Sequence, residues 1–356
     1  MTEELTYRKA EKADLPRISR FRKEFWGEHE TGRSSGPEYY EWKTLQNPFM
    51  PGEMYLAEDG TTVVGMKSMV PKRMRILGKE AAGAETGDTF THPGYQRRGI
   101  FTGLFAAAKR EQGIDTRLDY IFGLPNEVSL LGYERKLDYS QIPVNVRGLA
   151  LLLNPAPVLK TKLPALLAAV LAPAVKLYYQ TVFRMSTGGV KNAVVVRLEP
   201  AFPEDIETVW RHVMSSYDAA VIRDRDFLTW RYVNSPDKYR IYLARNRNGE
   251  ITGYMVTKFH GGNLPTGYLC DFLTREDDPR IFRSLLAEAV TDFKKDKVAL
   301  VTAYGVAGGF YDRLLRRAGF IRRARQVIIS YNNELGRRVL SGNCRWHFTM
   351  GDSDHV

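Results

Sequence analysis

The segment 91–101, with the sequence THPGYQRRGIF, constrains this chain more than any other part of it. It follows a predicted strand over 85–90 and leads into a predicted helix over 101–112, whose apolar residues recur at helical spacing. The free N–H groups at the start of a helix and the helix dipole attract anions, and Gly99 lets the backbone come close to a ligand. We therefore expect an anion-binding turn, with an ordinary solvated strand-to-helix connection as the alternative.

The order of residues in this turn indicates which kind of anion it would bind. The stretch QRRGIF, 96–101, resembles the pyrophosphate loop of the GCN5-related N-acetyltransferases (the GNAT superfamily), whose pattern is Gln/Arg-x-x-Gly-x-Gly/Ala. Gln96 and Gly99 match this pattern, whereas Phe101 stands where the family has Gly or Ala. The resemblance implies an N-acetyltransferase that moves an acetyl group from acetyl-coenzyme A (acetyl-CoA) to a primary amine by direct attack. The residues expected to bind this co-substrate are Phe90, Thr91, Gln96, Arg97, Arg98, Gly99, Ile100, Phe101 and Asn126.

The same resemblance implies an acid for the leaving thiolate. The next motif of the family places an Asn before a Tyr on one helix, and here Asn126 precedes Tyr133. A phenol with a pKa of about 10 stays protonated at neutral pH and can donate to a departing thiolate. Tyr133 is therefore the candidate acid, with a tyrosine that packs between helix and sheet as the alternative.

The attacking amine must lose a proton, so the reaction also needs a base. Glu85 and Asp88 lie on the predicted strand beside the expected thioester. Because of their spacing, they face opposite sides of a regular strand unless a bulge intervenes. We favour Glu85 as the base over Asp88, and we expect His92 to cap the loop.

The net charge of +11 favours anionic partners such as a phosphorylated co-substrate. Because the basic residues are dispersed rather than gathered in one run, the charge alone selects no partner. The resemblance implies a small-molecule amine acceptor, and we expect no nucleic acid. The two cysteines, Cys270 and Cys344, form no CxxC pair. We therefore expect neither a disulfide nor a metal site, and a cytoplasmic location.

The stretch 149–185 is rich in Leu, Ala, Val and Pro and contains no Asp or Glu. Its uncharged part, 163–175, is shorter than the about 20 residues that a membrane-spanning helix needs. We expect an apolar hairpin that packs between two domains. The alternative is a basic amphipathic element that touches a membrane surface or a partner.

The second half of the chain repeats residues of the first half in the same order. Trp42 is echoed by Trp230, and the run YLA at 55–57 is echoed by YLA at 242–244. Residue matches that keep the same order and nearly the same spacing in both halves indicate duplication of a domain. We therefore predict an α/β fold with two tandem GNAT-like domains, each a mixed central sheet flanked by helices. The predicted parts are an active domain at 1–148, a linker at 149–190 and a degenerate domain at 191–356.

The second half lacks the anion-binding turn. The corresponding stretch, 275–282, reads REDDPRIF, which has no glycine and places three acids where a pyrophosphate would lie. Like charges repel, so we expect one co-substrate site per chain.

Two further runs give a weaker resemblance to tandem members of the superfamily from bacterial cell-envelope polysaccharide clusters. These are IFGLPN at 121–126 and WHFTMGDSD at 346–354. This resemblance implies an amino sugar or a sugar nucleotide as the acceptor. Two alternatives stay open: an aminoacyltransferase of the peptidoglycan-bridge type, which uses aminoacyl-tRNA, and a non-catalytic scaffold or binding protein with the same fold.

Overall fold

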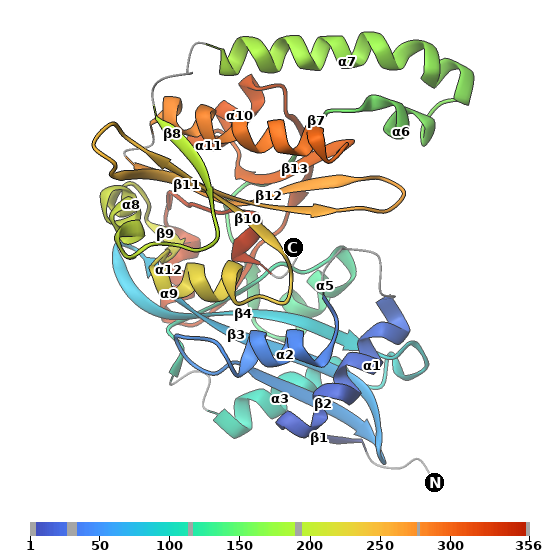
Figure 1. Cartoon of the computed structure of the whole chain (residues 1–356). Coiled ribbons are helices and arrows are strands. Elements are labelled where there is room, and N and C mark those ends of the chain that lie inside the picture. The colour runs from blue at the N-terminus through green and yellow to red at the C-terminus, as the bar shows by residue number, and fades with distance from the viewer. Residues whose placement is uncertain (1–4, 27–33, 113–116, 189–193, 276–277, 354–356) are drawn as a thin grey trace.

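The computed structural model describes residues 5–26, 34–112, 117–188, 194–275 and 278–353. Within these residues the chain forms two sheets, one above the other in the view of Figure 1, with helices around them. Each sheet is mixed, because one pair of neighbouring strands is parallel and the other pairs are antiparallel. The fold predicted from the sequence, α/β with mixed sheets flanked by helices, is confirmed.

The first sheet has eight strands, and its parallel pair is β4 with β5. In spatial order its strands are β1 (Thr6–Lys9), β2 (Glu53–Asp59), β3 (Thr62–Ile76), β4 (Lys79–Thr91), β5 (Tyr120–Gly123), β15 (Ile329–Tyr331) and β6 (Tyr139–Gln141), with β9 (Ala219–Val221) added on β3. Its helices are α1 (Leu15–Trp26), α2 (Pro37–Thr44), α3 (Ile100–Gln112) and α5 (Glu127–Lys136).

The second sheet has seven strands, and its parallel pair is β12 with β13. In spatial order its strands are β14 (Ile321–Gln326), β7 (Val146–Leu152), β13 (Leu300–Val306), β12 (Thr266–Thr274), β11 (Ile251–His260), β10 (Tyr239–Arg245) and β8 (Val195–Glu199). The remaining helices are α6 (Pro155–Lys160), α7 (Ala165–Thr187), α8 (Glu207–Val213), α9 (Arg225–Leu228), α10 (Pro279–Lys295), α11 (Phe310–Arg317) and α12 (Glu334–Ser341).

Each sheet is completed by a strand from the other half of the chain. Strand β7 directly follows the first-sheet strand β6 in sequence, but it lies between β13 and β14 of the second sheet. In return, β15 from the end of the chain lies between β5 and β6 of the first sheet. The two halves therefore hold each other through backbone hydrogen bonds as well as through side chains.

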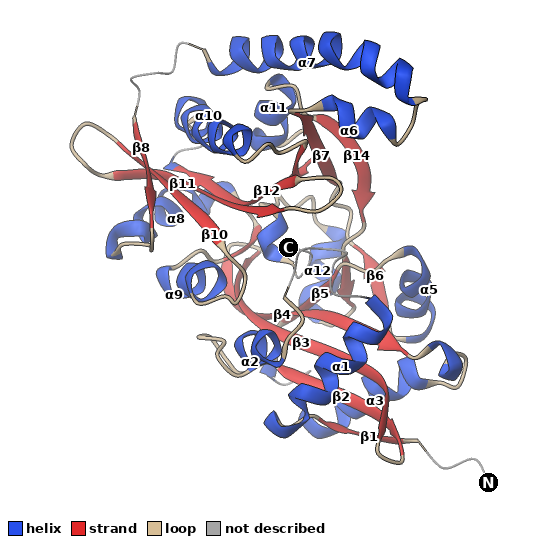
Figure 2. Ribbon diagram, turned by 45° about the vertical axis from the view of Figure 1, so that its right-hand side comes forward, coloured by secondary structure: helices blue, strands red, loops and turns tan. Residues whose placement is uncertain are grey.

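The first sheet separates two helical layers (Figure 2). Alternate residues of β2 divide between them: Met54 and Leu56 pack into the core that contains α1 and α2, whereas Tyr55 and Ala57 pack into the core that contains α3. This alternation is the period of a strand that is buried on both faces. The anion-binding turn and helix α3 thus lie on one face, and α1 lies on the other.

Helices α6 and α7 correspond to the apolar hairpin expected from 149–185. The hairpin does not pack between the two halves as expected. Helix α7 contacts α10, α11 and β7 and runs along the outer side of the second sheet (Figure 1). Small side chains such as Ala168 and Ala172, with Phe183, form the buried face that permits this packing.

Candidate active site

A groove of about 690 Å³ opens at the end of β4 where the first sheet meets α3 and α5. Its walls are the last residues of β4, the turn before α3 and the start of α5. The structure brings all but one of the predicted site residues into this groove. They are Glu85, Asp88, Phe90, Thr91, Gln96, Arg97, Gly99, Ile100, Phe101, Asn126 and Tyr133.

The turn before α3 has the backbone geometry of an anion site. His92 caps a short 3-10 turn, with its Nδ1 accepting a hydrogen bond from Gly94 N at 3.0 Å, as expected for this residue. Arg97 and Gly99 both have left-handed backbone angles, with φ of 64° and 80°. Successive N–H groups in such a turn can point to one side, and the first N–H groups of α3 have no partner within the helix.

The two arginines of the turn point to different places. Arg97 lines the groove, whereas the guanidinium of Arg98 lies over the Tyr95 ring, 4.9 Å from its centre. Arg98 therefore stacks on the turn itself and is not among the residues that line the groove, so the prediction that it binds the co-substrate gains no support from the geometry.

Phe101, which departs from the family pattern, is matched by a glycine on the neighbouring helix. A Cβ at Gly132 would come within 2.9 Å of the Phe101 ring. The ring also packs edge-on against Tyr133, with ring centres 5.3 Å apart. Gly132 on α5 thus leaves the space that Phe101 on α3 fills, and the backbone N–H of Phe101 stays at the start of the helix.

A bulge in β4 brings both candidate bases to the groove. Met66 of β3 pairs with Phe90, but Ser68 pairs with Gly87, so β4 carries one extra residue between these pairs. Asp88 lies in this bulge with a φ of 41°. Because the bulge shifts the alternation of the strand, Glu85 and Asp88 can both line the groove.

Each of these carboxylates is part of a buried ion pair. Lys43 Nζ lies 2.5 Å from Asp88 Oδ2, and Lys72 Nζ lies 2.7 Å from Glu85 Oε2. Lys72 also donates to the backbone carbonyl of Asp352 at 2.5 Å. A residue from the end of the chain therefore helps to hold the ion pair at the floor of the groove.

Tyr133 points its hydroxyl toward the bulge. Its oxygen lies 3.2 Å from Thr89 Oγ1, and its ring packs edge-on against Phe101 and Phe105. Burial raises the pKa of Tyr133 above the ordinary value of a phenol, and the hydrogen bond with Thr89 opposes this rise. The hydroxyl is therefore protonated at neutral pH and can donate a hydrogen bond into the groove.

Asn126 has a structural role at the start of α5, in addition to the co-substrate contact expected from the sequence. It is the N-cap of α5, with its side-chain oxygen accepting from Ser129 N at 2.8 Å. The same oxygen accepts from Ser129 Oγ at 2.9 Å. Its side-chain oxygen is thus already engaged in fixing the start of the helix that carries Tyr133.

Comparison with known proteins agrees with this geometry. Residues 6–129 match the family model described as the acetyltransferase (GNAT) domain. Residues 6–129 are therefore similar to a GNAT acetyltransferase domain. This domain contains the turn, both candidate bases and the start of α5, while Tyr133 lies just beyond the matched residues. No curated protein matches the sequence significantly.

Solved structures share the fold over nearly the whole chain. A conserved Enterococcus faecalis protein of unknown function, described as a probable N-acyltransferase, is 11% identical with a TM-score of 0.62, over 92% of this chain and 72% of its own. A GCN5-related N-acetyltransferase from Anabaena variabilis is 12% identical with a TM-score of 0.61, over 92% of this chain and 72% of its own. Saccharomyces cerevisiae N-myristoyltransferase with bound myristoyl-CoA is 13% identical with a TM-score of 0.59, over 93% of this chain and 78% of its own. The chain therefore has the fold of GNAT-type N-acyltransferases.

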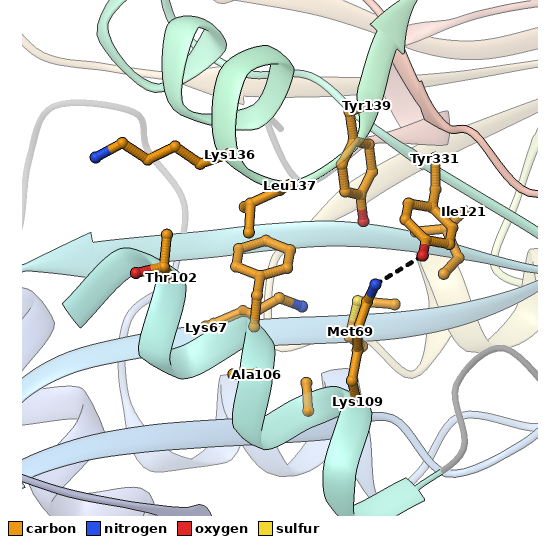
Figure 3. Close-up of a pocket in the computed structure, with 12 residues that line it drawn as sticks. Lys67, Met69, Thr102, Ala106, Lys109, Ile121, Lys136, Leu137, Tyr139 and Tyr331 are labelled. Atoms are coloured by element: carbon orange, nitrogen blue, oxygen red, sulfur yellow. Dashed lines mark hydrogen bonds between the residues drawn. The ribbon is translucent and has the colours of Figure 1, made fainter. Parts of the chain in front are cut away.

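A second, smaller cavity of about 240 Å³ lies between α3, the first sheet and the end of α5 (Figure 3). Its floor is apolar, with Met69, Ile121 and Leu137. Thr102 and Lys136 line both this cavity and the groove. The rings of Phe101, Phe105 and Tyr133 lie between the two spaces.

A buried lysine lines this second cavity. Lys67 is fully buried, and its Nζ lies 4.3 Å from the centre of the Phe105 ring without a hydrogen-bond partner among the described residues. Loss of solvent lowers the pKa of Lys67 to about 7. Lys109, at the mouth of the cavity, donates instead to Tyr331 Oη at 2.7 Å, which Figure 3 marks.

Sequence reasoning missed several residues that shape the site. No local sequence signal marks Lys43, Lys72 and Thr89, because the partner of each lies on another element of the fold. Arg22 on α1 also lines the groove, and the pattern of its helix gives no sign of this. Gly132 could have been noticed, because a glycine within a predicted helix often marks a close approach of another group.

Proposed function

We propose that this chain is an acyl-CoA-dependent N-acetyltransferase that transfers the acetyl group of acetyl-CoA to a primary amine by direct attack. The observation that carries this proposal is the turn at 96–101, where two left-handed residues precede the start of α3 at the mouth of the groove. Its backbone N–H groups and Arg97 would bind the pyrophosphate. Bound coenzyme A supplies the activated acyl group, and the chain's own residues orient it and move protons.

The walls of the groove favour a short acyl group. On the direct path from the groove to the apolar cavity beside α3, a long acyl chain would meet the rings of Phe101, Phe105 and Tyr133. These rings pack with centres 5.3 to 5.4 Å apart, so they close the direct way. We therefore propose acetyl-CoA rather than a long-chain donor such as the myristoyl-CoA bound by the yeast structure.

Tyr133 is the proposed acid. Its raised pKa keeps the hydroxyl protonated, and Thr89 fixes the direction of the oxygen. A hydrogen bond from this hydroxyl would stabilise the thiolate of coenzyme A as it leaves. Because the ring also packs against two phenylalanines, a purely structural role is the alternative that the experiment must separate.

Glu85 is the proposed base and acts through water. A buried carboxylate that is paired with a lysine would leave that lysine unbalanced if it took up a proton permanently. The proton of the amine must therefore pass on to solvent in the groove. Asp88 in the bulge, which is paired with Lys43, would mainly hold the shape of β4.

The second half of the chain would bind no coenzyme A. Helix α10 starts at the position that corresponds to α3, and Asp278 caps it by accepting from Arg280 N at 2.7 Å. The carboxylate of Asp278 thus takes the place at the start of α10 where a bound anion would otherwise be attracted. Of the three acids noted in the sequence, Glu276 and Asp277 lie outside the described residues. We propose that this half arose by duplication and now supports the first half.

The acceptor belongs to the amines, and we propose an amino sugar or a sugar nucleotide as its class. The test is the release of free thiol from acetyl-CoA by the purified chain with a panel of amino sugars, nucleotide amino sugars, polyamines and peptides. Turnover with one class and a strong loss of turnover in Tyr133→Phe, at unchanged acetyl-CoA affinity, would support the proposal. Absence of both acetyl-CoA binding and thiol release would reject it, and binding of aminoacyl-tRNA instead would favour the peptidoglycan-bridge alternative.

A further inference from the structure

Arg22 is a buried cation in the groove that has no partner among the residues that the structure describes. Its side chain lines the groove from α1 and is only 4% exposed. Its Nε is buried without a hydrogen-bond partner, and among the described residues the guanidinium forms no ion pair. An arginine is always charged in a protein, and buried charges are normally paired. Arg22 therefore differs from Arg223, which is also buried but is paired with Asp271 and Asp352.

The carboxylates of the groove do not neutralise Arg22. Glu85 is already paired with Lys72, and Asp88 is already paired with Lys43. Each of these pairs sums to no net charge. Within the described part of the chain, no carboxylate is thus left to balance the positive charge of Arg22, and a bound anion would supply that balance.

Arg22 reaches the groove from a different face of the first sheet than the proposed phosphate turn. Helix α1 packs on the face of the first sheet opposite to α3, since the two helices belong to different cores. The proposed phosphate turn, with Arg97, lies at the start of α3. An anion at Arg22 would therefore be separate from the phosphates of the donor.

We propose that Arg22 binds a carboxylate or a phosphate of the acceptor and so selects amines that carry an anionic group. This inference rests on the proposed acetyltransferase function. The planar fork of a guanidinium makes two parallel hydrogen bonds with either anion, and both are stronger where water is excluded. Neutral amino sugars and polyamines would lack this contact and leave Arg22 unpaired.

The experiment compares matched acceptors in the parent, Arg22→Met and Arg22→Lys. The acceptors are glucosamine, glucosamine 6-phosphate, glutamate and glutamine, and the readouts are kcat and KM for thiol release. We expect the parent to prefer an anionic acceptor by about 100-fold in kcat/KM and Arg22→Met to lose that preference, mainly through KM. Arg22→Lys should keep part of it. The paired acceptors separate a phosphate from a carboxylate.

Three controls keep this proposal distinct from a structural role and from the acetyltransferase proposal. Arg20→Met changes an exposed arginine of the same helix and should leave both acceptors unchanged. Acetyl-CoA affinity should be equal in all variants. Arg22→Met should unfold no earlier than the parent, because it removes an unpaired buried charge. Equal losses for neutral and anionic acceptors, or a lower melting temperature in Arg22→Met, would overturn the role of Arg22 even if thiol release proves the activity.

A second inference rests on a different part of the chain, the outer face of α7. The face that includes Ala168, Ala172 and Phe183 is buried against the protein. On the opposite side, Leu166, Val170, Leu177 and Met185 are 66–80% exposed. A soluble helix normally turns its polar side outward, so this apolar face needs a partner of its own.

The charges around this face select the partner. Between Asp138 and Glu199 the sequence contains no acid, and the hairpin carries Lys160, Lys162, Lys176 and Arg184. Two copies of the chain that met through this face would bring like charges together. An anionic surface would be attracted by these basic side chains.

The packing of α7 decides how it would meet a membrane. By length and composition alone, the helix is long and apolar enough to span a bilayer. Part of it is buried in the protein. Its contacts with α10, α11 and β7 would have to break for it to span. We infer that α7 instead lies flat on an anionic phospholipid bilayer, with its apolar face in the headgroup region.

Sedimentation with lipid vesicles tests this inference. The full chain should bind vesicles of phosphatidylcholine with phosphatidylglycerol and should bind pure phosphatidylcholine vesicles weakly, with the difference reduced by salt. Replacing Val170 and Leu177 with Gln should weaken binding about 10-fold, whereas Leu198→Gln, a change at an exposed leucine on β8, should not. Equal binding by the parent and the double variant would overturn the inference. A dimer that the same double variant dissociates would also overturn it in favour of a second copy.

Discussion

Trp42 and Trp230 stack with their ring centres 5.0 Å apart, and each indole N–H donates to the backbone carbonyl of the other residue. The hydrogen bonds measure 2.8 and 3.0 Å, and the two residues are 188 positions apart. A contact in which each residue makes the same bond to the other is what a two-fold relation produces. The same two residues match each other in the repeated sequence pattern, so we interpret the pair as the centre of a duplicated chain.

This pair should couple the two halves energetically. Trp42→Phe and Trp230→Phe each leave one buried carbonyl without its donor, which should cost about 1–3 kcal/mol in the free energy of unfolding. The double variant should cost less than the two single costs together, because the interaction is shared. Urea unfolding of the four proteins measures this, with Trp210→Phe as a control for a buried tryptophan elsewhere. Additive costs would contradict a shared contact.

Gly132 and Phe101 should depend on each other. Gly132→Ala places a methyl group within 2.9 Å of the Phe101 ring and should push α3 away from α5. We expect a loss of stability of about 1–3 kcal/mol and weaker acetyl-CoA binding. Adding Phe101→Ala should restore the affinity, because the ring that is displaced is then absent. Calorimetric titration of the three variants checks this, and Gly132→Ala without any effect on affinity would show that the fit is unimportant.

The buried Lys67 should make stability depend on pH. Its pKa falls from 10.5 to about 7 in the folded chain, so the unfolded chain holds this proton more tightly between those values. Stability should therefore rise with pH through this window, and the penalty for burying the charge is complete below about pH 7. Lys67→Met should raise the melting temperature, by more at about pH 6 than at about pH 9.

A matched lysine gives the control for this prediction. Lys43 is equally buried but is paired with Asp88. Lys43→Met should lower stability by about 3–5 kcal/mol, since it leaves a buried carboxylate unpaired. Thermal unfolding of both variants across the pH range separates the two cases. A gain in Lys67→Met that does not change with pH would mean that Lys67 keeps its proton in the folded chain.

The end of the chain should be essential for folding. Asp352 is buried, and its carboxylate binds Arg223, which also binds Asp271. Burial raises the pKa of Asp271, and Arg223 opposes this rise. Asp352→Asn should therefore cost about 3–5 kcal/mol, whereas Asp218→Asn, at an exposed pair with Arg345, should cost less than about 1 kcal/mol. Chemical denaturation compares them, and similar costs would contradict a role for burial.

The sequence predicted the parts of the site that are local in the chain. The turn at 96–101, the helix after it and the cap at His92 follow from residues that are neighbours in sequence. Asp138, just after α5, has a φ of 57°, a left-handed angle that Asp adopts more readily than most residues. The backbone geometry of such a turn or cap is determined by residues that are neighbours in the sequence, so it can be recognised from a short stretch.

The sequence could not predict contacts that join distant parts of the chain. The exchange of β7 and β15 between the sheets depends on pairing between strands far apart in sequence. Burial of Lys72 and of Asp352 depends on the same assembly of the two halves. Lys72 lies in the first half of the chain and donates to the backbone carbonyl of Asp352 in the second half. For 149–185 the sequence left two alternatives open, packing between domains or contact with a membrane surface or partner, since a helical pattern does not reveal which face meets the protein.

The most direct test of the account is calorimetric titration of the full chain with acetyl-CoA, beside the same titration of Gly99→Glu. Gly99 has a φ of 80°, and a glutamate there would place strain and a negative charge in the proposed phosphate turn. The account predicts one binding site per chain in the parent and no measurable binding in the variant, with both proteins folded by circular dichroism. Two sites per chain, no binding by the parent, or equal affinity in Gly99→Glu would contradict it.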